Sequence, residues 1–208
     1  MRFAPLNLVL VAGLSVAALA ASLATPTLAV AGGIGVVGTG GMFSDRVYYY
    51  DADDNQYRQN QIIPTFGTGL DLVVGDRDDR IVGIARFYWQ ADGAERNPAD
   101  SSGIPIAGSE VTAAPRDSTR NTGVFAVGLQ GGLIGDPDKA MLVINGTVGS
   151  GFMTPDHTEY VFGELGVGGT VRVGNQIELF ANVNAHMRFR KWLRPGATTY
   201  AGARVLFD

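Results

Sequence analysis

The sequence contains no cysteine among its 208 residues. A disulfide framework and a lipid-modified N-terminal cysteine are therefore both excluded. The chain has two histidines and a formal net charge of −4, whereas a nucleic-acid partner would favour a strongly basic face. We expect no nucleic-acid partner and no cofactor, and stability must come from a packed core or a closed hydrogen-bonded scaffold.

Long apolar runs are also scarce, and the longest extends from Leu6 to Ala24, near the N-terminus. It follows Arg2 and precedes Ala29-Val30-Ala31, an A-x-A pattern typical of a secretory signal peptide. We expect residues 1–31 to be a cleaved signal and residues 32–208 to form one domain. The alternative is a retained anchor helix, because the run approaches the roughly 20 residues that a spanning helix needs. The cleavage pattern and the many small residues favour the signal.

Glycine is abundant, with 29 residues spread through apolar segments. This disfavours helices, since each glycine costs about 1 kcal/mol relative to alanine. From Ile177 to Arg190 apolar and polar residues alternate with a period of two, broken only by Phe180, which indicates a strand. Soluble strands usually run about 5–6 residues. At roughly 3.3 Å per residue and a tilt near 40°, this segment is long enough to cross a hydrocarbon core of about 30 Å.

Seven further segments have the same character, and with Ile177–Arg190 they predict an all-β, eight-stranded, antiparallel, up-and-down transmembrane barrel. An even strand number lets an antiparallel barrel close without an unpaired edge in lipid. The seven segments are Ile34–Ser44, Ile62–Gly75, Asp79–Gln90, Asn121–Ile134, Ala140–Met153, Glu159–Val173 and Ala197–Phe207.

The connections are predicted to alternate in length. Tight polar turns are expected at 75–78, 135–138 and 174–175, and longer connections on the other side, with long outer loops at 45–61 and 91–120. Short turns on one side and long loops on the other are typical of outer-membrane barrels. The sequence therefore predicts an outer-membrane location.

The alternation also assigns the two faces of each strand, with the more apolar set facing lipid. The outward aromatic residues are expected to lie toward strand ends, at the membrane interfaces; they are Phe66, Phe87, Trp89, Phe152, Phe189 and Phe207. The polar and charged residues expected in the lumen are Asp71, Arg86, Glu164, Arg172, Glu178, His186, Arg188, Arg190 and Arg204. Because side chains fill the interior of an eight-stranded barrel, we expect a plugged lumen with paired charges.

The last strand ends in Val205-Leu206-Phe207-Asp208. An apolar strand that finishes with an aromatic residue resembles the signal that outer-membrane barrels present to their assembly machinery, although those signals usually end on the aromatic itself, whereas Asp208 follows here. Over residues 32–208 the pattern resembles the small eight-stranded barrels of the OmpA transmembrane-domain and OmpX type. The resemblance is architectural, and it implies outer-membrane lipid and the barrel-assembly machinery as partners. The alternative is a soluble lipocalin-like barrel, in which the apolar face would turn inward.

The predicted loop at 45–61 is rich in tyrosine and acidic residues, and its Asp51, Asp53 and Asn55 match the opening of a calcium-binding loop. The match fails where glycine and a bidentate glutamate are needed, because Gln56 and Ile62 occupy those positions. We therefore expect no metal site. The candidate contact residues for a partner are Tyr48, Tyr49, Tyr50, Asp51, Asp53 and Tyr57.

Catalytic residues are not apparent. A lipid-modifying hydrolase of this architecture would need a serine, a histidine and a carboxylate on one face. The lipid A deacylases among these barrels have a serine two residues after their histidine, whereas His186 is followed at that position by Arg188. Ser150 is expected to face lipid. No catalytic residue is therefore assigned.

Three functions remain as hypotheses. The first is a non-enzymatic outer-membrane barrel that has a structural role or docks an envelope protein through its outer loops, as in an adhesion, motility or secretion assembly. The second is a narrow anion-preferring channel, motivated by an apparent excess of arginine in the lumen. The third is a lipid-modifying enzyme that uses His186.

Overall fold

The computed structural model describes residues 31–50, 56–75, 80–95, 119–154, 158–190 and 192–207. The expected signal peptide lies almost entirely outside these residues and stays a prediction. The described chain forms eight strands, which are β1 (Gly32–Tyr50), β2 (Gln56–Val74), β3 (Ile81–Asp92), β4 (Arg120–Asp136), β5 (Ala140–Thr154), β6 (Thr158–Val173), β7 (Ile177–Phe189) and β8 (Leu193–Phe207).

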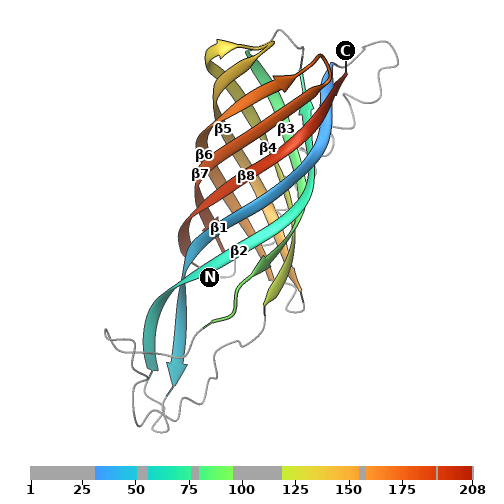
Figure 1. Ribbon diagram of the computed structural model, residues 1–208. Coiled ribbons are helices and arrows are strands. Elements are labelled where there is room, and N and C mark those ends of the chain that lie inside the picture. Colours follow the sequence, from blue (N-terminus) through green and yellow to red (C-terminus); the bar gives the residue numbers. More distant parts are fainter. Residues whose placement is uncertain are drawn as a thin grey trace, which may run out of the picture.

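The strands form one closed antiparallel barrel (Figure 1). Each strand pairs with the next along the chain, and β1 also pairs with β8, from Gly32 opposite Phe207 to Phe43 opposite Gly196. The predicted fold class, strand number and up-and-down order are therefore confirmed. Within the described residues, no helix has the length and apolar character needed to cross a membrane.

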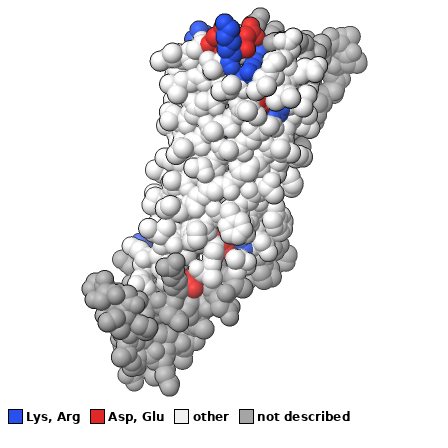
Figure 2. Space-filling model, viewed as in Figure 1, with Lys and Arg blue, Asp and Glu red and all other residues white. Residues whose placement is uncertain are grey.

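The two faces of the sheet differ in chemistry. In β7 every odd-numbered side chain from Ile177 to Phe189 is exposed and every even-numbered one is buried. The exposed positions of the other strands also carry large apolar residues, among them Leu70, Val148 and Leu165. Figure 2 shows that charged side chains gather at one end of the visible face and that its middle is uncharged. The predicted assignment of faces is confirmed, with the apolar face outside.

One end of the barrel, here the turn end, carries short connections at 75–80, 137–139 and 174–176. Gly174 in the last of these has φ +68°, a backbone conformation that favours glycine. At the other end, here the loop end, the connections are 51–55, 93–119, 155–157 and 190–192. Only 93–119 is long, so the expectation that all four loop-end connections are longer or bulkier than the turns is wrong in part.

The predicted long loop at 45–61 is wrong, because most of it is strand. β1 and β2 stay paired as far as Tyr50 opposite Gln56. β8 accompanies β1 only to Phe43, and β3 accompanies β2 only as far as Thr65. The hairpin therefore projects beyond the closed barrel, as Figure 1 shows at its lower end. We call the projecting part, residues 44–50 and 56–64, the ribbon.

The reason for this error is physical. A strand inside a barrel must alternate because its two faces meet different surroundings, whereas a projecting hairpin has no such requirement. The polar residues Asp45 and Arg46 therefore predict the end of a strand, whereas β1 continues through both of them. A similar error occurs in β8, which begins at Leu193 although a loop was expected up to Gly196. Pro195 is tolerated there because it lies beyond the last residue paired with β1.

Candidate functional site

The lumen collects almost all of the residues predicted for it. Those placed inside are Asp71, Arg86, Glu164, Arg172, Glu178, His186, Arg188 and Arg204. The exception is Arg190, which is exposed because β7 ends at Phe189 and the alternation stops there. The prediction that Arg190 faces the lumen is therefore wrong.

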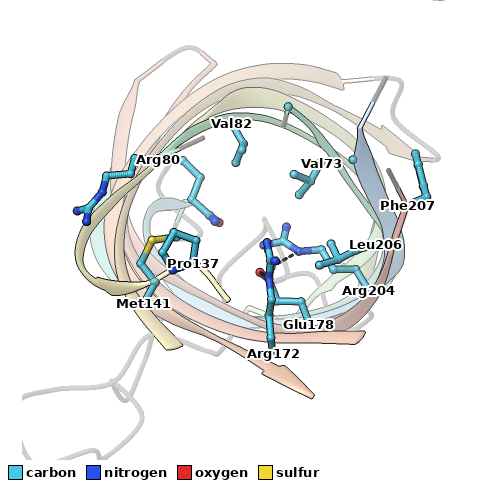
Figure 3. Close-up of a pocket in the computed structure, with 13 residues that line it drawn as sticks. Val73, Arg80, Val82, Pro137, Met141, Arg172, Glu178, Arg204, Leu206 and Phe207 are labelled. Atoms are coloured by element: carbon cyan, nitrogen blue, oxygen red, sulfur yellow. Dashed lines mark hydrogen bonds and ion pairs between the residues drawn. The ribbon is translucent and has the colours of Figure 1, made fainter. Parts of the chain in front are cut away.

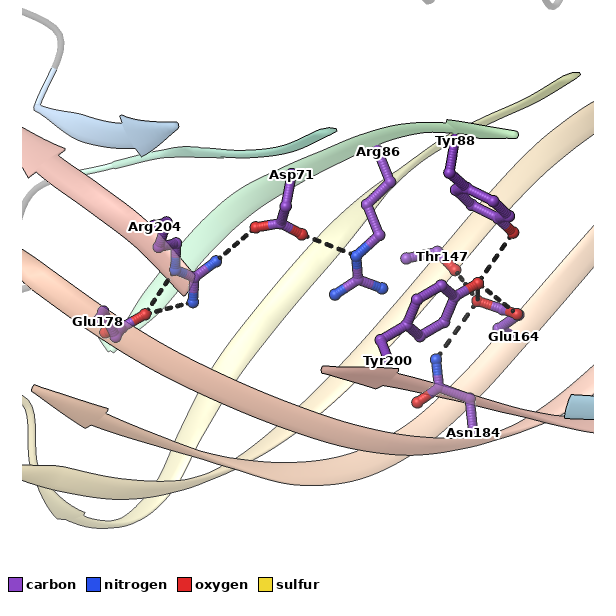
Figure 4. Close-up of polar contacts among 9 residues, drawn as sticks. All are labelled: Asp71, Arg86, Tyr88, Thr147, Glu164, Glu178, Asn184, Tyr200 and Arg204. Carbon is purple, nitrogen blue, oxygen red and sulfur yellow. Dashed lines mark hydrogen bonds and ion pairs between the residues drawn. The ribbon is translucent and has the colours of Figure 1, made fainter. Parts of the chain in front are cut away.

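A charge cluster near the turn end centres on Asp71, whose carboxylate accepts from two arginines (Figure 4). Arg86 Nε donates to Oδ1 at 2.8 Å, and Arg204 Nη1 donates to Oδ2 at 3.0 Å. Arg204 also donates through Nε to Glu178 Oε1 at 2.6 Å. Arg172 Nε lies 3.6 Å from Glu178 Oε2, and Arg172 Nη1 lies 3.2 Å from Oδ1 of Asp138 in the β4–β5 turn. The buried charges are compensated, which offsets the cost of removing them from water.

A second cluster lies halfway along the lumen around Glu164 (Figure 4). Its carboxylate accepts from Tyr200 Oη at 2.9 Å, Thr147 Oγ1 at 2.9 Å and Asn184 Nδ2 at 3.3 Å. Because the single hydroxyl hydrogen of Tyr200 goes to Glu164, Tyr88 Oη must be the donor in its 3.0 Å contact with Tyr200 Oη. The two tyrosines meet edge to face, with ring centroids 5.8 Å apart.

His186 continues this cluster toward the loop end. Its Nδ1 lies 2.6 Å from Glu164 Oε1, and its Nε2 lies 2.9 Å from Arg188 Nε. Arg188 then donates from Nη1 to Asp92 Oδ2 at 3.1 Å, and Gln90 Nε2 donates to Asp92 Oδ1 at 2.6 Å. A continuous line of polar contacts thus crosses the lumen from β6 through β7 to β3.

Aromatic rings fill the space around these charges. Phe162 stacks on His186 with ring centroids 5.0 Å apart. Each of three arginines has its guanidinium carbon over at least one ring; the pairs are Arg188 over Phe43 at 4.0 Å and over Tyr160 at 4.7 Å, Arg86 over Tyr200 at 4.3 Å, and Arg204 over Phe180 at 4.9 Å. The interior is packed with side chains, as expected for eight strands.

The lumen does not carry the predicted excess of arginine. Asp45 is buried at the loop end, with Oδ1 3.0 Å from Arg194 Nε, and Asp92 is fully buried against Arg188. The sequence predicts loops at 45–61 and 91–120 and so places both acids outside the lumen, which is wrong. The buried acidic residues of the described chain are Asp45, Asp71, Asp92, Glu164 and Glu178. Each contacts an arginine or His186, so the observation that motivated an anion channel is corrected.

The six outward aromatic residues are all exposed on the apolar face. Trp89, Phe152 and Phe189 lie toward the loop end of their strands, and Phe207 lies at the turn end. Phe66 lies in the middle of β2 but next to Thr65, where the pairing with β3 ends at the loop side of the closed barrel. Phe87 lies in the middle of β3, so the expectation that all six mark strand ends is wrong for this residue. The outer face thus has an aromatic-rich margin on the loop side.

Four of the six candidate contact residues belong to the ribbon. The backbones of Tyr48, Tyr49, Tyr50 and Tyr57 belong to β1 and β2, while their side chains lie outside the described part of the chain. Asp51 and Asp53 lie wholly outside it. Among the residues that are described, no group of three or more metal-binding side chains comes together.

Several lumen residues were missed although a signal for them was present. Each missed tyrosine lies an even number of residues from an inward-facing residue on the same strand and so faces the same way. The pairs are Tyr88 with Arg86, Tyr160 with Glu164, and Tyr200 with Arg204. Parity also assigns Asp92 to the lumen once β3 is extended to its observed end. The tyrosines carry no formal charge, so a prediction of lumen charges omits them, and Asp45 and Asp92 lie beyond the predicted strand ends.

Comparison with known proteins adds little to this geometry. No family model and no curated protein matches the sequence. Among solved structures, the chain is similar to OmpT (in-vitro folded), an outer membrane protein of Vibrio cholerae, with 9% sequence identity and a TM-score of 0.31. The match covers 84% of this chain and 52% of that one, so this chain spans about half the length of the structure it matches. A similarity this low does not transfer a function, and what is established is the architecture: a closed eight-stranded β-barrel with an apolar exterior and a charged, filled interior.

Proposed function

We propose that this chain is a non-enzymatic outer-membrane barrel, exported through a cleaved signal at residues 1–31, that docks an envelope partner through its loop end. The membrane part of the proposal rests on the distribution of side chains, which is the reverse of that in a soluble protein: apolar side chains lie outside and charged ones inside. Large apolar side chains such as Leu165, Val167 and Val183 are more than half exposed, whereas Asp71, Arg86 and Arg204 are almost completely buried. A soluble barrel would lose free energy on both counts, because exposed apolar area and buried charge are each unfavourable in water.

The exposed apolar surface is also continuous around the barrel. Every strand contributes large apolar side chains that are at least about two-fifths exposed, from Ile34 and Val36 on β1 to Val205 and Phe207 on β8. Monomeric soluble proteins rarely expose contiguous apolar patches larger than a few hundred Å². Lipid chains are the occupant that covers such a closed belt on all sides.

The docking part of the proposal rests on the ribbon. Within the described chain, β1 is paired with β8 only as far as Phe43 and β2 is paired with β3 only from Thr65, so the ribbon extends beyond both neighbouring strands. A hairpin that projects beyond its neighbouring strands is a surface on which another extended chain can pair. The sequence of the ribbon is rich in tyrosine, a residue type that gives binding surfaces large contact area at low entropic cost.

A channel and an enzyme are less well supported. The lumen is filled, and its buried acids are matched by cationic or histidine partners, so no arginine excess favours anions. The hydrogen bonds of His186 go to Glu164 and Arg188, and Ser150 donates to the carbonyl oxygen of Tyr160 on the outer side of β5. No nucleophile with a base beside it is present in that arrangement.

The membrane part is tested by refolding residues 32–208 with phospholipid vesicles. We expect the protein to float with the vesicles and to migrate differently on gels before and after boiling. Folded protein that stays in solution without lipid or detergent would contradict the proposal.

The docking part is tested separately with a photo-reactive residue at Gln59 on the ribbon, used in intact cells. We expect one defined crosslinked envelope protein, and no such product from the same probe at Asn175 in a turn at the opposite end. A variant in which residues 47–58 are replaced by a tight turn should keep the heat-modifiable barrel and lose partner binding. Crosslinking that is equal at both ends would contradict docking at the loop end.

A further inference from the structure

The turn-side half of the lumen contains amide side chains that the protein itself does not satisfy. Gln130 on β4 lies opposite Asn145 on β5, and Asn182 lies on β7. Each is at least 97% buried. Within the described chain, Gln130 Oε1 and both polar atoms of the Asn145 and Asn182 amides have no hydrogen-bond partner. Arg86 donates from Nε to Asp71, but its Nη1 and Nη2 atoms also have no hydrogen-bond partner and belong to the same set.

Such a set is costly unless something else bonds to it. A buried donor or acceptor without a partner costs about 1–3 kcal/mol. Several such groups together would consume much of the roughly 5–15 kcal/mol by which a domain is stable. Water is the natural partner, because buried waters make about three hydrogen bonds each to polar groups that are otherwise unsatisfied.

An entrance for water lies at the turn end. A small cavity of about 40 Å³ opens there, and its walls include Gln130, Arg172, Glu178 and Arg204 (Figure 3). This exceeds the roughly 10–15 Å³ that one water molecule requires. Gln130 is thus both part of the wall of this cavity and one of the unsatisfied amides, so the cavity reaches the first member of the amide set, which lies opposite Asn145 on the next strand.

The amide set ends where the central cluster begins. The next inward residue after Asn145 on β5 is Thr147, and the next after Asn182 on β7 is Asn184, and both donate to Glu164. Glu164 is also bonded to Tyr200, which contacts Tyr88 across the barrel. Farther toward the loop end the lumen is lined by rings such as Phe162, which stacks on His186.

We propose that the turn-side half of the lumen is a water-binding half-channel, entered past Gln130 and closed by the layer of Tyr88, Tyr200 and Glu164. Its ligand is water or an ion small enough to replace water. The proposal concerns the interior alone and holds whether or not the loop end docks a partner.

Silver ions test this proposal, because Ag⁺ reacts with thiols, is small enough to follow water, and meets no cysteine in the natural chain. Asn145→Cys and Asn182→Cys place a thiol in the half-channel, Phe162→Cys places one beyond the closing layer, and Asn175→Cys provides an exposed reference. Each variant is refolded as residues 32–208 in detergent, where both ends meet water, and its folding is checked by heat-modifiable migration.

The expected result is reaction of the two half-channel thiols with silver nitrate within about tenfold of the reference, while the Phe162→Cys thiol, reachable only through local opening, reacts about 100-fold more slowly. Half-channel thiols as slow as the Phe162→Cys thiol would overturn the proposed water path. A Phe162→Cys thiol as fast as the reference would overturn the restriction of water to the turn-side half of the lumen.

The unsubstituted protein provides a second readout that does not depend on the variants folding. In NMR spectra of the protein in detergent, we expect the side-chain amide protons of Asn145 and Asn182 to show cross-peaks with water. The Asn184 amide, which donates to Glu164, should show weaker cross-peaks. Absence of water cross-peaks from Asn145 and Asn182 would overturn the proposal.

Discussion

Arg188 Nε donates a hydrogen bond to His186 Nε2 at 2.9 Å. Because an arginine side chain has donors and no acceptor, Nε2 must carry a lone pair and not a hydrogen. The proton of the imidazole is then on Nδ1, from which it is donated to Glu164 at 2.6 Å. One buried histidine therefore joins an anion to a cation without being charged itself.

This arrangement predicts the tautomer of His186. In the folded barrel we expect a neutral ring with hydrogen on Nδ1 and a bare Nε2, which ¹⁵N chemical shifts and ring proton correlations report directly. Replacement of Arg188 by Met removes the donor to Nε2, and the Nε2 shift should change while the Nδ1 proton remains on its bond to Glu164. Hydrogen found on Nε2 in the unsubstituted protein would contradict the assignment.

The turn-side charge cluster predicts a large stability effect for Asp71. Asp71→Asn leaves Arg86 and Arg204 without the carboxylate that they share, and we expect a loss of about 3–5 kcal/mol in the free energy of unfolding. The matched control is Asp138→Asn, which breaks the partly exposed contact with Arg172 and should cost less than about 1 kcal/mol. Urea unfolding of the lipid-embedded protein measures both. Equal losses in the two variants would show that burial does not determine how much these ion pairs contribute to the free energy of unfolding.

The apolar exterior predicts a dependence on depth. Val183 lies in the middle of β7 and Ile177 at its turn end, and both face outward. Val183→Arg should destabilise the barrel in bilayers by about 2–4 kcal/mol, and Ile177→Arg by about 0–1 kcal/mol, because the cost of a cation falls toward the interface. Unfolding in vesicles measures the difference. If Val183→Arg were as well tolerated as Ile177→Arg, lipid would not be the surrounding medium.

The filled lumen predicts that the natural protein conducts poorly and that the central layer is the barrier. Removing the rings of Tyr88 and Tyr200 together should produce discrete single-channel events in planar bilayers that the natural protein lacks, because these rings meet across the lumen. Arg190→Gln is the control and should change nothing, since Arg190 is exposed beyond β7. Steady conductance of the natural protein that changes with Arg188→Gln would instead favour the channel hypothesis.

Much of the candidate site was accessible from the sequence because one rule, alternation, connects residue number to face. It placed Asp71, Glu164 and Arg204 inside and Phe66 outside, as observed. The rule failed near strand ends, at Arg190 after β7 and at Asp45 on β1. The residues at a strand end and in a projecting hairpin do not have lipid on one face and the lumen on the other, so alternation does not mark where the strand stops. The partners within the lumen were also beyond prediction from sequence, since Arg188 and Asp92 are brought together only when β7 and β3 face each other across the closed barrel.

The sequence alone therefore determined the number of strands, their antiparallel order and the face of nearly every side chain, because a period of two is a local property of an extended backbone. The tertiary structure decided the rest. Closure of β1 on β8 sets which inward residues of separate hairpins share a level of the lumen. It decides that Asp71, which lies opposite Arg86 on the adjacent strand, also meets Arg204, and that Glu164, which lies opposite His186, also meets Tyr200. The contacts of Asp71 with Arg204 and of Glu164 with Tyr200 join residues on strands that are not neighbours in the chain, and no local pattern records the register and shear that align them.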